Sequence, residues 1–358
     1  MSNTTRRTVV LSAAVAAATL GLGKRLAIAQ SNVPTPKQPP QRPQKPKVTQ
    51  PKQPPANPVE RFAQTPDPVH GFHRYKVGDA TCTALYDGIW EKAHDSGFFS
   101  NASVDDTKKA LQSAGLISAY VPITLTVLVI EVNGKTIMCD AGGGGQVQAF
   151  DQRSLFVSGK LKTNMKLAGI DPAKIDMILV SHFHPDHIFG LMEKGTNKPI
   201  YPNAEIILSA PEYRWWTDPS VIGRLPPARR PLAQRIQAVF PTWKNITQVE
   251  DAAEAVPGLR FVATPGHTAG HVSFHLSSGR DQLMISNDAA YVPALDAVHP
   301  DWRGVFDQDP DLAVTTRRKL LDWVASDRMR ICGYHFPWPG VGTLDKDGDG
   351  YALHLDKA

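Results

Sequence analysis

Short apolar runs alternate with amphipathic segments along the chain from about residue 66 onward. The apolar runs are rich in β-branched side chains and bounded by turn residues, which is typical of strands, whereas the amphipathic segments repeat their apolar residues with helical spacing. Hairpins mixed with strand–helix units favour mixed sheets covered by helices, an α+β domain over residues 66–358. We predict strands at 80–86, 123–132, 135–140, 176–180, 205–209, 259–263, 272–277, 282–287 and 329–333, and helices near 160–168, 228–239 and 311–325.

Turn and cap residues sharpen several of these boundaries. Asn133-Gly134 lies between two β-rich runs and is the strongest short hairpin signal that a sequence offers. Ser103, followed three residues later by Asp106, predicts a capped helix start. The glycines at 142–145 lack the Gly-Lys-Ser/Thr of a phosphate loop. Residues 345–350 match the first half of a calcium loop, but the short strands expected on either side favour a hairpin turn.

The first 65 residues differ in composition from the rest. Paired Arg6-Arg7, an apolar run over 8–23 and small residues before position 30 predict a twin-arginine signal peptide over 1–29. The apolar run is shorter than the roughly 20 residues that a membrane-spanning helix needs, so we expect no membrane span. Residues 30–65 are rich in Pro, Lys and Gln and are expected to form a disordered linker. We therefore expect a periplasmic or secreted protein.

Charge is segregated in the same way. Residues 1–59 hold nine of the 39 Lys and Arg and none of the 34 Asp and Glu, which leaves 30 basic and 34 acidic side chains for the rest. A nucleic-acid partner needs a basic face on the folded domain, so we expect none. The three cysteines, Cys82, Cys139 and Cys332, have no C-x-x-C spacing and lie in or beside predicted strands. We expect buried thiols rather than disulfides.

The segment with the strongest chemical signal follows the strand predicted at 176–180. It reads His182-Phe183-His184-Pro185-Asp186-His187, three imidazoles and a carboxylate within six residues. Neutral imidazoles and carboxylates are donors that suit zinc. His182 and His184, two residues apart, can face one metal, while Asp186 and His187, on the turn that opens the next helix, can face a second.

Further candidate ligands follow other predicted strands. His267 comes after Thr264-Pro265-Gly266, Asp288 closes one strand, and His335 closes another. Strand ends let a rigid sheet present side chains from distant parts of the chain to one cleft. The joint pattern therefore predicts a two-metal centre.

With these residues in place, the chain resembles the metallo-β-lactamase superfamily, whose pattern is H-x-H-x-D-H followed by H, D and H. The resemblance implies an αββα sandwich with the metals at one edge of the two packed sheets. It further implies two Zn²⁺ per chain, with Fe, Mn or Co as alternatives. By it, His182, His184 and His267 would hold the first metal, Asp186, His187 and His335 the second, and Asp288 would bridge both. Asp140, in the place of the family's Asp-Thr-Gly turn, is expected to orient a ligand imidazole.

Two details within the family point to different substrates. Asp288-Ala289-Ala290-Tyr291 is similar to the acyl-homoserine lactonase branch, in which a tyrosine at this spacing hydrogen-bonds the substrate carbonyl. The segments at 83–88 and 335–340 are similar instead to methyl parathion hydrolase, a phosphotriesterase. A class B β-lactamase is the third alternative, which the bridging Asp288 disfavours. A non-catalytic envelope protein that keeps the fold is the alternative outside the enzymes.

The reaction implied is hydrolysis of a lactone, ester or phosphotriester bond by a hydroxide bridging the two metals. Asp186, Asp288 and Tyr291 are the candidate catalytic residues. We expect Trp215, Trp216, Trp302 and Phe306 to line an apolar pocket that favours acyl-chain lactones or aryl esters over charged substrates. The expected partner is a small-molecule substrate, and the sequence allows a homodimer.

Overall fold

The computed structural model describes residues 67–149 and 152–357. The signal peptide and linker predicted over 1–65 lie outside the described residues. Within the described part, two mixed sheets account for all the strands. The first sheet is ordered β1-β2-β3-β4-β6-β7-β8, with β5 paired to β2, and the second is ordered β15-β14-β13-β12-β11-β10-β9.

The strands of the first sheet are β1 (Phe72–Val77), β2 (Ala80–Lys92), β3 (Val121–Val132), β4 (Lys135–Cys139), β5 (Leu155–Val157), β6 (Met177–Val180), β7 (Glu205–Ser209) and β8 (Ile246–Val249). Those of the second are β9 (Glu254–Val256), β10 (Leu259–Ala263), β11 (Val272–Ser278), β12 (Asp281–Ile285), β13 (Arg330–Cys332), β14 (Val341–Asp347) and β15 (Gly350–Leu355).

The α-helices are α2 (Val104–Ser113), α3 (Leu161–Leu167), α4 (Pro185–Ile188), α5 (Ala210–Thr217), α6 (Val221–Arg224), α7 (Arg230–Val239), α8 (Pro293–Asp296) and α9 (Pro310–Ser326). Short 3₁₀ turns are η1 (Pro172–Lys174), η2 (Phe189–Leu191), η3 (Pro227–Arg229), η4 (Phe240–Thr242) and η5 (Asn287–Ala289). None of the helices in the described ranges has both the length and the apolarity needed to cross a bilayer.

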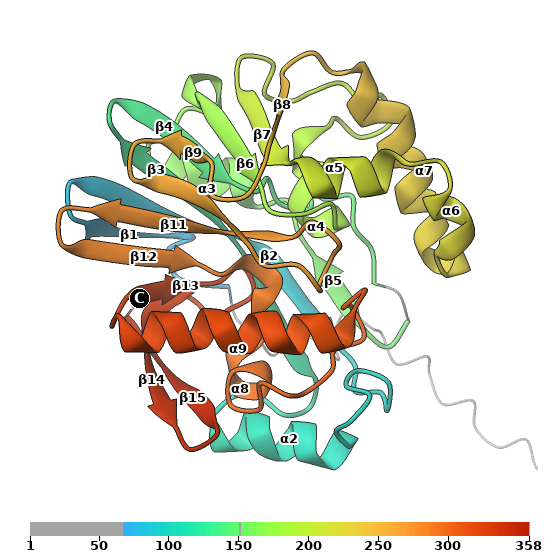
Figure 1. The fold of residues 1–358 in the computed structure, drawn as a ribbon, viewed down its shortest axis with the longest axis vertical. Helices are drawn as coiled ribbons and strands as arrows, with labels where there is room; N and C mark the ends of the chain where they lie inside the picture. Colours follow the sequence, from blue (N-terminus) through green and yellow to red (C-terminus); the bar gives the residue numbers. More distant parts are fainter. Residues whose placement is uncertain (1–66, 150–151, 358) are drawn as a thin grey trace, which may run out of the picture. The chain divides into compact units, whose positions relative to one another are not determined.

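Apolar side chains from the inner faces of the two sheets form one shared core. The core joins Val77, Cys82, Leu128 and Ile137 of the first sheet to Phe261, Phe274, Leu283 and Cys332 of the second. Trp216 and Ile236 of the α5–α7 region pack on the outer face of the first sheet, and Leu321 of α9 packs on the outer face of the second. Figure 1 shows α9 lying across the second sheet and α5, α6 and α7 grouped beside β7. The expected αββα sandwich is therefore confirmed.

Strand direction explains why the site forms at one edge of the sandwich. The pairs β4–β6, β6–β7 and β12–β13 are parallel. β10 runs in the same direction as β12, because both are antiparallel to β11. The carboxyl ends of parallel strands meet at one edge of a sheet, so the loops that follow these strands converge.

The turn and the helix cap predicted from the sequence both form. Asn133 and Gly134 both have positive φ, 51° and 71°, as a tight turn between β3 and β4 requires. Ser103 and Asp106 form the capping box of α2. The segment at 345–350 forms the turn between β14 and β15, as the hairpin interpretation predicted.

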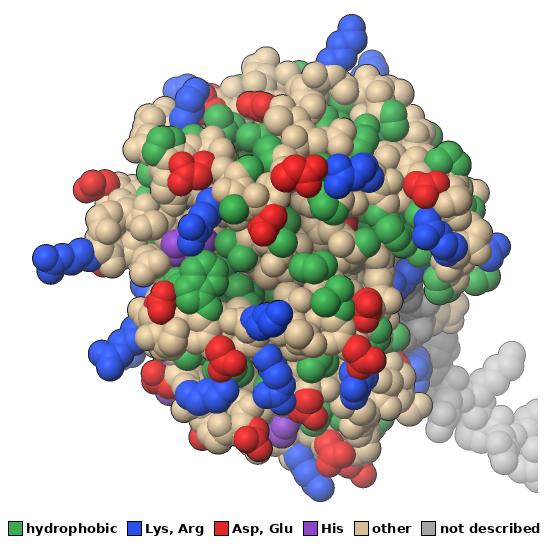
Figure 2. Space-filling model, in the orientation of Figure 1, with side chains coloured by type: hydrophobic (Ala, Val, Ile, Leu, Met, Phe, Trp, Pro, Cys, Tyr) green, Lys and Arg blue, Asp and Glu red, His purple; other side chains and the backbone are tan. Residues whose placement is uncertain are grey.

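Two of the candidate ligands lie farther from their strands than the sequence predicts. β12 ends at Ile285, two residues earlier than predicted, and Asp288 lies in η5. β13 is shorter than predicted, so His335 follows two loop residues rather than the strand itself. All three cysteines are buried and unpaired, as expected. The face drawn in Figure 2 carries Lys and Arg side chains interspersed with Asp and Glu.

Candidate metal centre and pocket

The H-x-H-P-D-H segment changes conformation at Pro185, and this change divides its ligands. The chain leaves the buried strand β6 in extended form, so that His182 and His184 project toward the same place. His184 is the N-cap of α4, and Pro185 is its first residue, which suits the fixed φ of proline. Asp186 and His187 then lie on the single turn of α4 and project in another direction.

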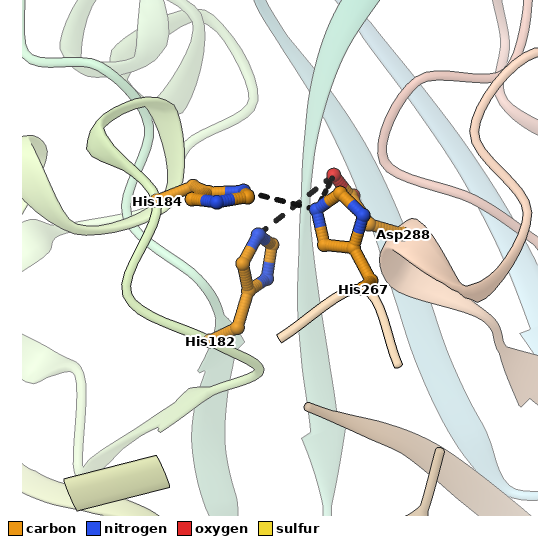
Figure 3. A group of neighbouring side chains, drawn as sticks. All are labelled: His182, His184, His267 and Asp288. Atoms are coloured by element: carbon orange, nitrogen blue, oxygen red, sulfur yellow. Dashed lines mark hydrogen bonds and ion pairs between the residues drawn. The ribbon is translucent and has the colours of Figure 1, made fainter. Parts of the chain in front are cut away.

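The first group of converging side chains contains His182, His184, His267 and Asp288. Figure 3 shows the three imidazoles and the carboxylate pointing toward one another, with His182 and His184 on one segment and His267 and Asp288 on two others. His184 Nδ1 lies 2.9 Å from His267 Nε2. Asp288 Oδ2 lies 3.2 Å from His267 Nε2 and 3.8 Å from His182 Nε2. Each residue offers one ligand atom, and these atoms lie within 4.8 Å of one another.

The second group contains Asp186, His187 and His335. Asp186 Oδ2 is 3.6 Å from His187 Nε2 and 3.4 Å from His335 Nε2. Asp288 faces this group as well, because its Oδ1 lies 3.4 Å from His187 Nε2 and its Oδ2 lies 3.2 Å from His335 Nε2. The structure thus brings together all seven predicted ligands, with Asp288 between the two groups.

Buried polar atoms without partners test whether metal fits this arrangement. His182 Nε2, His187 Nε2 and Asp288 Oδ1 are buried and form no hydrogen bond within the described residues. Leaving such groups unpaired in the interior is costly, and a cation would satisfy all three. Imidazole nitrogens and carboxylate oxygens are donors for divalent zinc, iron, manganese or cobalt. The donor set therefore fits a divalent metal site.

The charge states of these residues suit the same conclusion. Burial lowers the pKa of His182 and of His184 well below the ordinary value, so both are neutral donors. Burial acts to raise the pKa of Asp288, but the surrounding imidazoles outweigh it and hold that pKa well below its usual range. Burial acts to lower the pKa of His267, but the carboxylates of Asp288 and Asp307 outweigh it and raise that pKa to about 9. A metal would take the place of the proton that these carboxylates attract.

Residues behind the ligands fix the orientation of their rings. Asp140 Oδ2 accepts a hydrogen bond from His187 Nδ1 at 2.8 Å. The same carboxylate accepts from the backbone N–H and the hydroxyl of Ser181, both at 2.8 Å. This geometry agrees with the role predicted for Asp140. His335 Nδ1 lies 2.8 Å from the carbonyl oxygen of Thr124, so the imidazole presents Nε2 to the ligand cluster.

Two further contacts orient the ligand residues, and the first of them was not anticipated from the sequence. Asp307 Oδ1 lies 2.9 Å from His267 Nδ1, and the guanidinium of the fully buried Arg317 lies 3.4 Å from Asp307 Oδ2. His271 Nε2 accepts a hydrogen bond from the backbone N–H of Asp288 at 3.2 Å. Asp307 is one of several acids in a loop without regular structure, and nothing in its spacing marks it.

Glu212, also missed from the sequence, ties the two histidine loops together. This buried carboxylate of α5 accepts from the backbone N–H of Phe183 at 2.9 Å and from Trp216 Nε1 at 2.7 Å. Its other oxygen accepts from Thr268 Oγ1 at 2.8 Å and from the backbone N–H of Gly270 at 2.9 Å. One side chain thereby links the loop after β6 to the loop after β10.

A cavity of about 380 Å³ opens over both ligand groups. Tyr291, Phe306 and Trp90 line it together with ligands from each group. The expectation for the tryptophans is wrong: Trp216 is fully buried in the core beneath the first sheet's helices, where its Nε1 binds Glu212. Trp302 packs against Phe99 with ring centroids 5.1 Å apart, and neither it nor Trp215 lines the cavity.

Tyr291 is one of the buried residues that line this cavity. Its ring stacks on Phe99 with centroids 6.4 Å apart, and its hydroxyl forms no hydrogen bond within the described residues. Burial raises the pKa of Tyr291 well above its ordinary value, so the hydroxyl keeps its proton at neutral pH. The hydroxyl is packed against Gly304 and keeps an unpaired hydrogen-bond donor beside the cavity.

Two packed sheets flanked by helices, with imidazoles and carboxylates converging at one edge, define the architecture of a metal-dependent hydrolase fold. The chain belongs to the metallo-beta-lactamase superfamily, whose model matches residues 122–335. An N-acyl homoserine lactonase of Bacillus thuringiensis is 24% identical over 168 residues, which cover 47% of this chain and 58% of that protein. The match thus spans little more than half the length of the curated relative.

Solved structures show the same fold. The chain resembles AidC, described as a dizinc quorum-quenching lactonase in complex with a product, with a TM-score of 0.73 and 26% identity over 80% of this chain and 98% of that one. It also resembles the hydrolase AbOPH of the beta lactamase superfamily, with a TM-score of 0.72 and 24% identity over 81% of this chain and all of that one.

Proposed function

We propose that this protein is a binuclear zinc hydrolase that opens lactone rings, with acyl-homoserine lactones as the favoured substrates. The observation that carries the proposal is the convergence of seven imidazole and carboxylate ligands, in two groups, at a cavity that Tyr291 also lines. The lactonases among the relatives and solved structures support the same substrate class.

The metals proposed here are two zinc ions. His182, His184 and His267 would hold the first, Asp186, His187 and His335 the second, and Asp288 would contact both. Divalent metals at these positions would supply Lewis-acid chemistry, lowering the pKa of a coordinated water and stabilising negative charge on the substrate.

The chain's own groups would position the substrate and keep the ligands in place. The Tyr291 hydroxyl would donate a hydrogen bond to the lactone carbonyl oxygen, and this bond strengthens as negative charge develops on that oxygen. Apolar side chains of the cavity, such as Trp90 and Ile123, would hold the acyl chain and exclude bulk water. Asp140 and Asp307 would keep the imidazoles of His187 and His267 in the orientation that ligation needs.

A phosphotriesterase of the methyl parathion hydrolase kind is the second candidate. The two segments that suggested it contact each other, since Tyr86 packs edge-on against Trp338 with ring centroids 5.8 Å apart. Residues 83–88 are part of β2, and the segment 335–340 follows β13. Within these two segments, His335 lines the cavity, whereas Tyr86 and Trp338 do not. The similarity of these two segments to methyl parathion hydrolase is therefore weaker support for a shared substrate than for a shared fold.

A hydrolysis panel tests the proposal. The zinc-loaded full-length protein would be assayed with N-hexanoyl-homoserine lactone, methyl parathion, an aryl ester and a carbapenem. The lactone should be opened most efficiently, with release of one proton per ring. Tyr291→Phe should slow lactone opening while leaving the metal content unchanged, and Tyr213→Phe, a tyrosine outside the cavity, serves as its control. If methyl parathion or the carbapenem were hydrolysed faster than the lactone, the proposed lactonase function would be wrong, and the protein would be a phosphotriesterase or a β-lactamase.

Export by the twin-arginine route to the periplasm or beyond is a separate proposal, which rests on residues 1–29 alone. Fractionation of cells expressing the full chain, compared with an Arg6→Lys, Arg7→Lys double variant, tests it. The wild-type protein should appear outside the cytoplasm and the variant should be retained.

A further inference from the structure

One wall of the cavity is basic, which the sequence analysis did not anticipate. The segment that forms η3 and α7 contributes Arg229, Leu232 and Arg235 to the cavity lining. The expectation of an apolar mouth is therefore only partly correct. Two guanidinium groups face a space whose other walls include Trp90 and Phe156.

Arg229 is held in place by neutral acceptors. Its Nη2 donates to the carbonyl oxygen of Val305 at 3.0 Å and more weakly to that of Phe306 at 3.5 Å. Its Nε has no hydrogen bond within the described residues, and no carboxylate there lies within ion-pair distance of the guanidinium. Asp307, which acts to raise the pKa of Arg229, is already engaged by His267 and Arg317.

Arg235 is positioned in a similar way. Its guanidinium lies over the ring of Phe189, 4.2 Å from the centroid. Its Nη2 donates to Gln146 Oε1 at 2.9 Å and to Asn197 Oδ1 at 2.8 Å. These contacts are again neutral, so they fix the side chain and leave its positive charge uncompensated.

The acids that line the same cavity do not neutralise these arginines. Asp186 and Asp288 face the imidazole groups and are the expected metal ligands. A half-buried guanidinium without a counter-charge is costly, and an anion in the cavity would offset that cost. The arginines are also pre-organised, which lowers the entropy lost on binding.

We infer that Arg229 and Arg235 bind a carboxylate carried by the substrate away from the bond that is broken. This inference rests on the proposed hydrolase function and narrows its substrate class. The reacting carbonyl would lie over the ligand cluster, an apolar chain would lie against the aromatic side chains, and the far carboxylate would reach the basic wall. Among the lactones and esters of the proposed function, the basic wall therefore favours those whose acyl chain ends in a carboxylate.

The test compares two aryl esters of equal chain length. p-Nitrophenyl hexanoate is neutral, whereas mono-p-nitrophenyl adipate carries a terminal carboxylate. The zinc-loaded wild-type protein should have the higher kcat/KM for the adipate ester. Arg229→Gln should lower kcat/KM for that ester by about tenfold or more, chiefly through KM, because hydrogen bonds to charged groups are individually strong. Hydrolysis of the hexanoate should change by less than about threefold, which also shows that the variant is folded.

Three other variants complete the set. Arg235→Gln should weaken the adipate preference in the same direction, and Arg229→Lys should restore part of it. The matched control is Arg230→Gln, because Arg230 is exposed, donates to the carbonyl oxygen of Leu225 at 3.0 Å and lies outside the cavity lining. That change removes one positive charge from the same segment and should leave the preference intact. Equal losses on both esters, or no wild-type preference, would overturn the inference.

A binding measurement separates this inference from the proposed function. Calorimetry with adipate and hexanoate needs no turnover, and both ligands offer one carboxylate to the ligand cluster. Adipate should bind more tightly than hexanoate to the wild-type protein, and Arg229→Gln should abolish the difference. If the protein hydrolysed neither ester but still bound adipate more tightly than hexanoate, the proposed hydrolase function would be refuted and the basic subsite would stand. Equal affinities for the two acids would refute the subsite.

Discussion

Removal of the Glu212 carboxylate is the most revealing change to the scaffold of the metal centre. Glu212 is buried and accepts four hydrogen bonds, from Phe183, Trp216, Thr268 and Gly270. In Glu212→Ala these four donors lose their acceptor in a place that water does not reach freely. An unsatisfied buried donor costs about 1–3 kcal/mol, so we expect the free energy of unfolding to fall by at least about 4 kcal/mol.

The isosteric variant separates charge from shape. In Glu212→Gln the amide oxygen can still accept from Phe183 and Trp216, and the Thr268 hydroxyl can rotate to accept from the amide. The amide nitrogen then meets the N–H of Gly270, so one donor remains unsatisfied. The expected loss is about 1–3 kcal/mol. Both variants should bind metal more weakly, because the loops that carry His184 and His267 lose their common tether.

Urea unfolding of the metal-free protein, followed by circular dichroism, measures the first effect, and zinc titration measures the second. Glu250→Gln is the control, since Glu250 is exposed and pairs only with Arg214 at 3.1 Å. Its loss should be below about 1 kcal/mol. If Glu212→Ala unfolded within 1 kcal/mol of the wild type and kept its zinc affinity, the role of Glu212 as a tether would be refuted.

Three further changes test other parts of the site. Asp288→Asn should lower the zinc content and suppress lactone opening by about a hundredfold or more, since one carboxylate faces both ligand groups; two retained equivalents with full activity would contradict this. Tyr291→Phe should reduce kcat/KM for a lactone by about tenfold, the value of one hydrogen bond to developing charge, and unchanged kinetics would leave Tyr291 a packing residue. Burial lowers the pKa of His271 to about 3 from an unfolded value near 6.5, so folding favours the neutral ring. The contribution of His271 to the free energy of unfolding is full above pH 6.5 and falls by about 2 kcal/mol by pH 5, because the unfolded chain binds the proton more readily. Urea unfolding of the metal-free His271→Gln variant should lack this part of the pH dependence. A pH profile identical to that of the wild type would contradict the role of His271.

The parts of the fold that the sequence predicts are those with a strong local signal. The Asn133-Gly134 turn and the Ser103 capping box act through neighbouring residues, and both form as expected. β1 was missed because its residues alternate between partly buried and exposed, and the strand is specified by pairing with β2 rather than by a local apolar run. β8 is the edge strand of the first sheet, and none of its four residues is fully buried.

The candidate site divides in the same way. The ligands were predictable because all seven are histidines or acids, four of them in one short motif and three in segments that follow strands. Asp307 and Glu212 were not, since each acts on a partner at least 29 residues away and lies in a segment of ordinary composition. The basic wall was missed because Arg229 and Arg235 belong to an ordinary amphipathic segment, which forms η3 and α7, and only the fold places that segment at the cavity.

Metal analysis of the purified full-length protein tests the central claim most directly. After zinc loading and removal of free metal, elemental analysis should find close to two equivalents of zinc per chain, and Asp288→Asn should retain fewer. A wild-type protein that holds less than about a tenth of an equivalent, with zinc, iron, manganese and cobalt each offered in turn, would contradict the metal centre and the hydrolase function proposed from it.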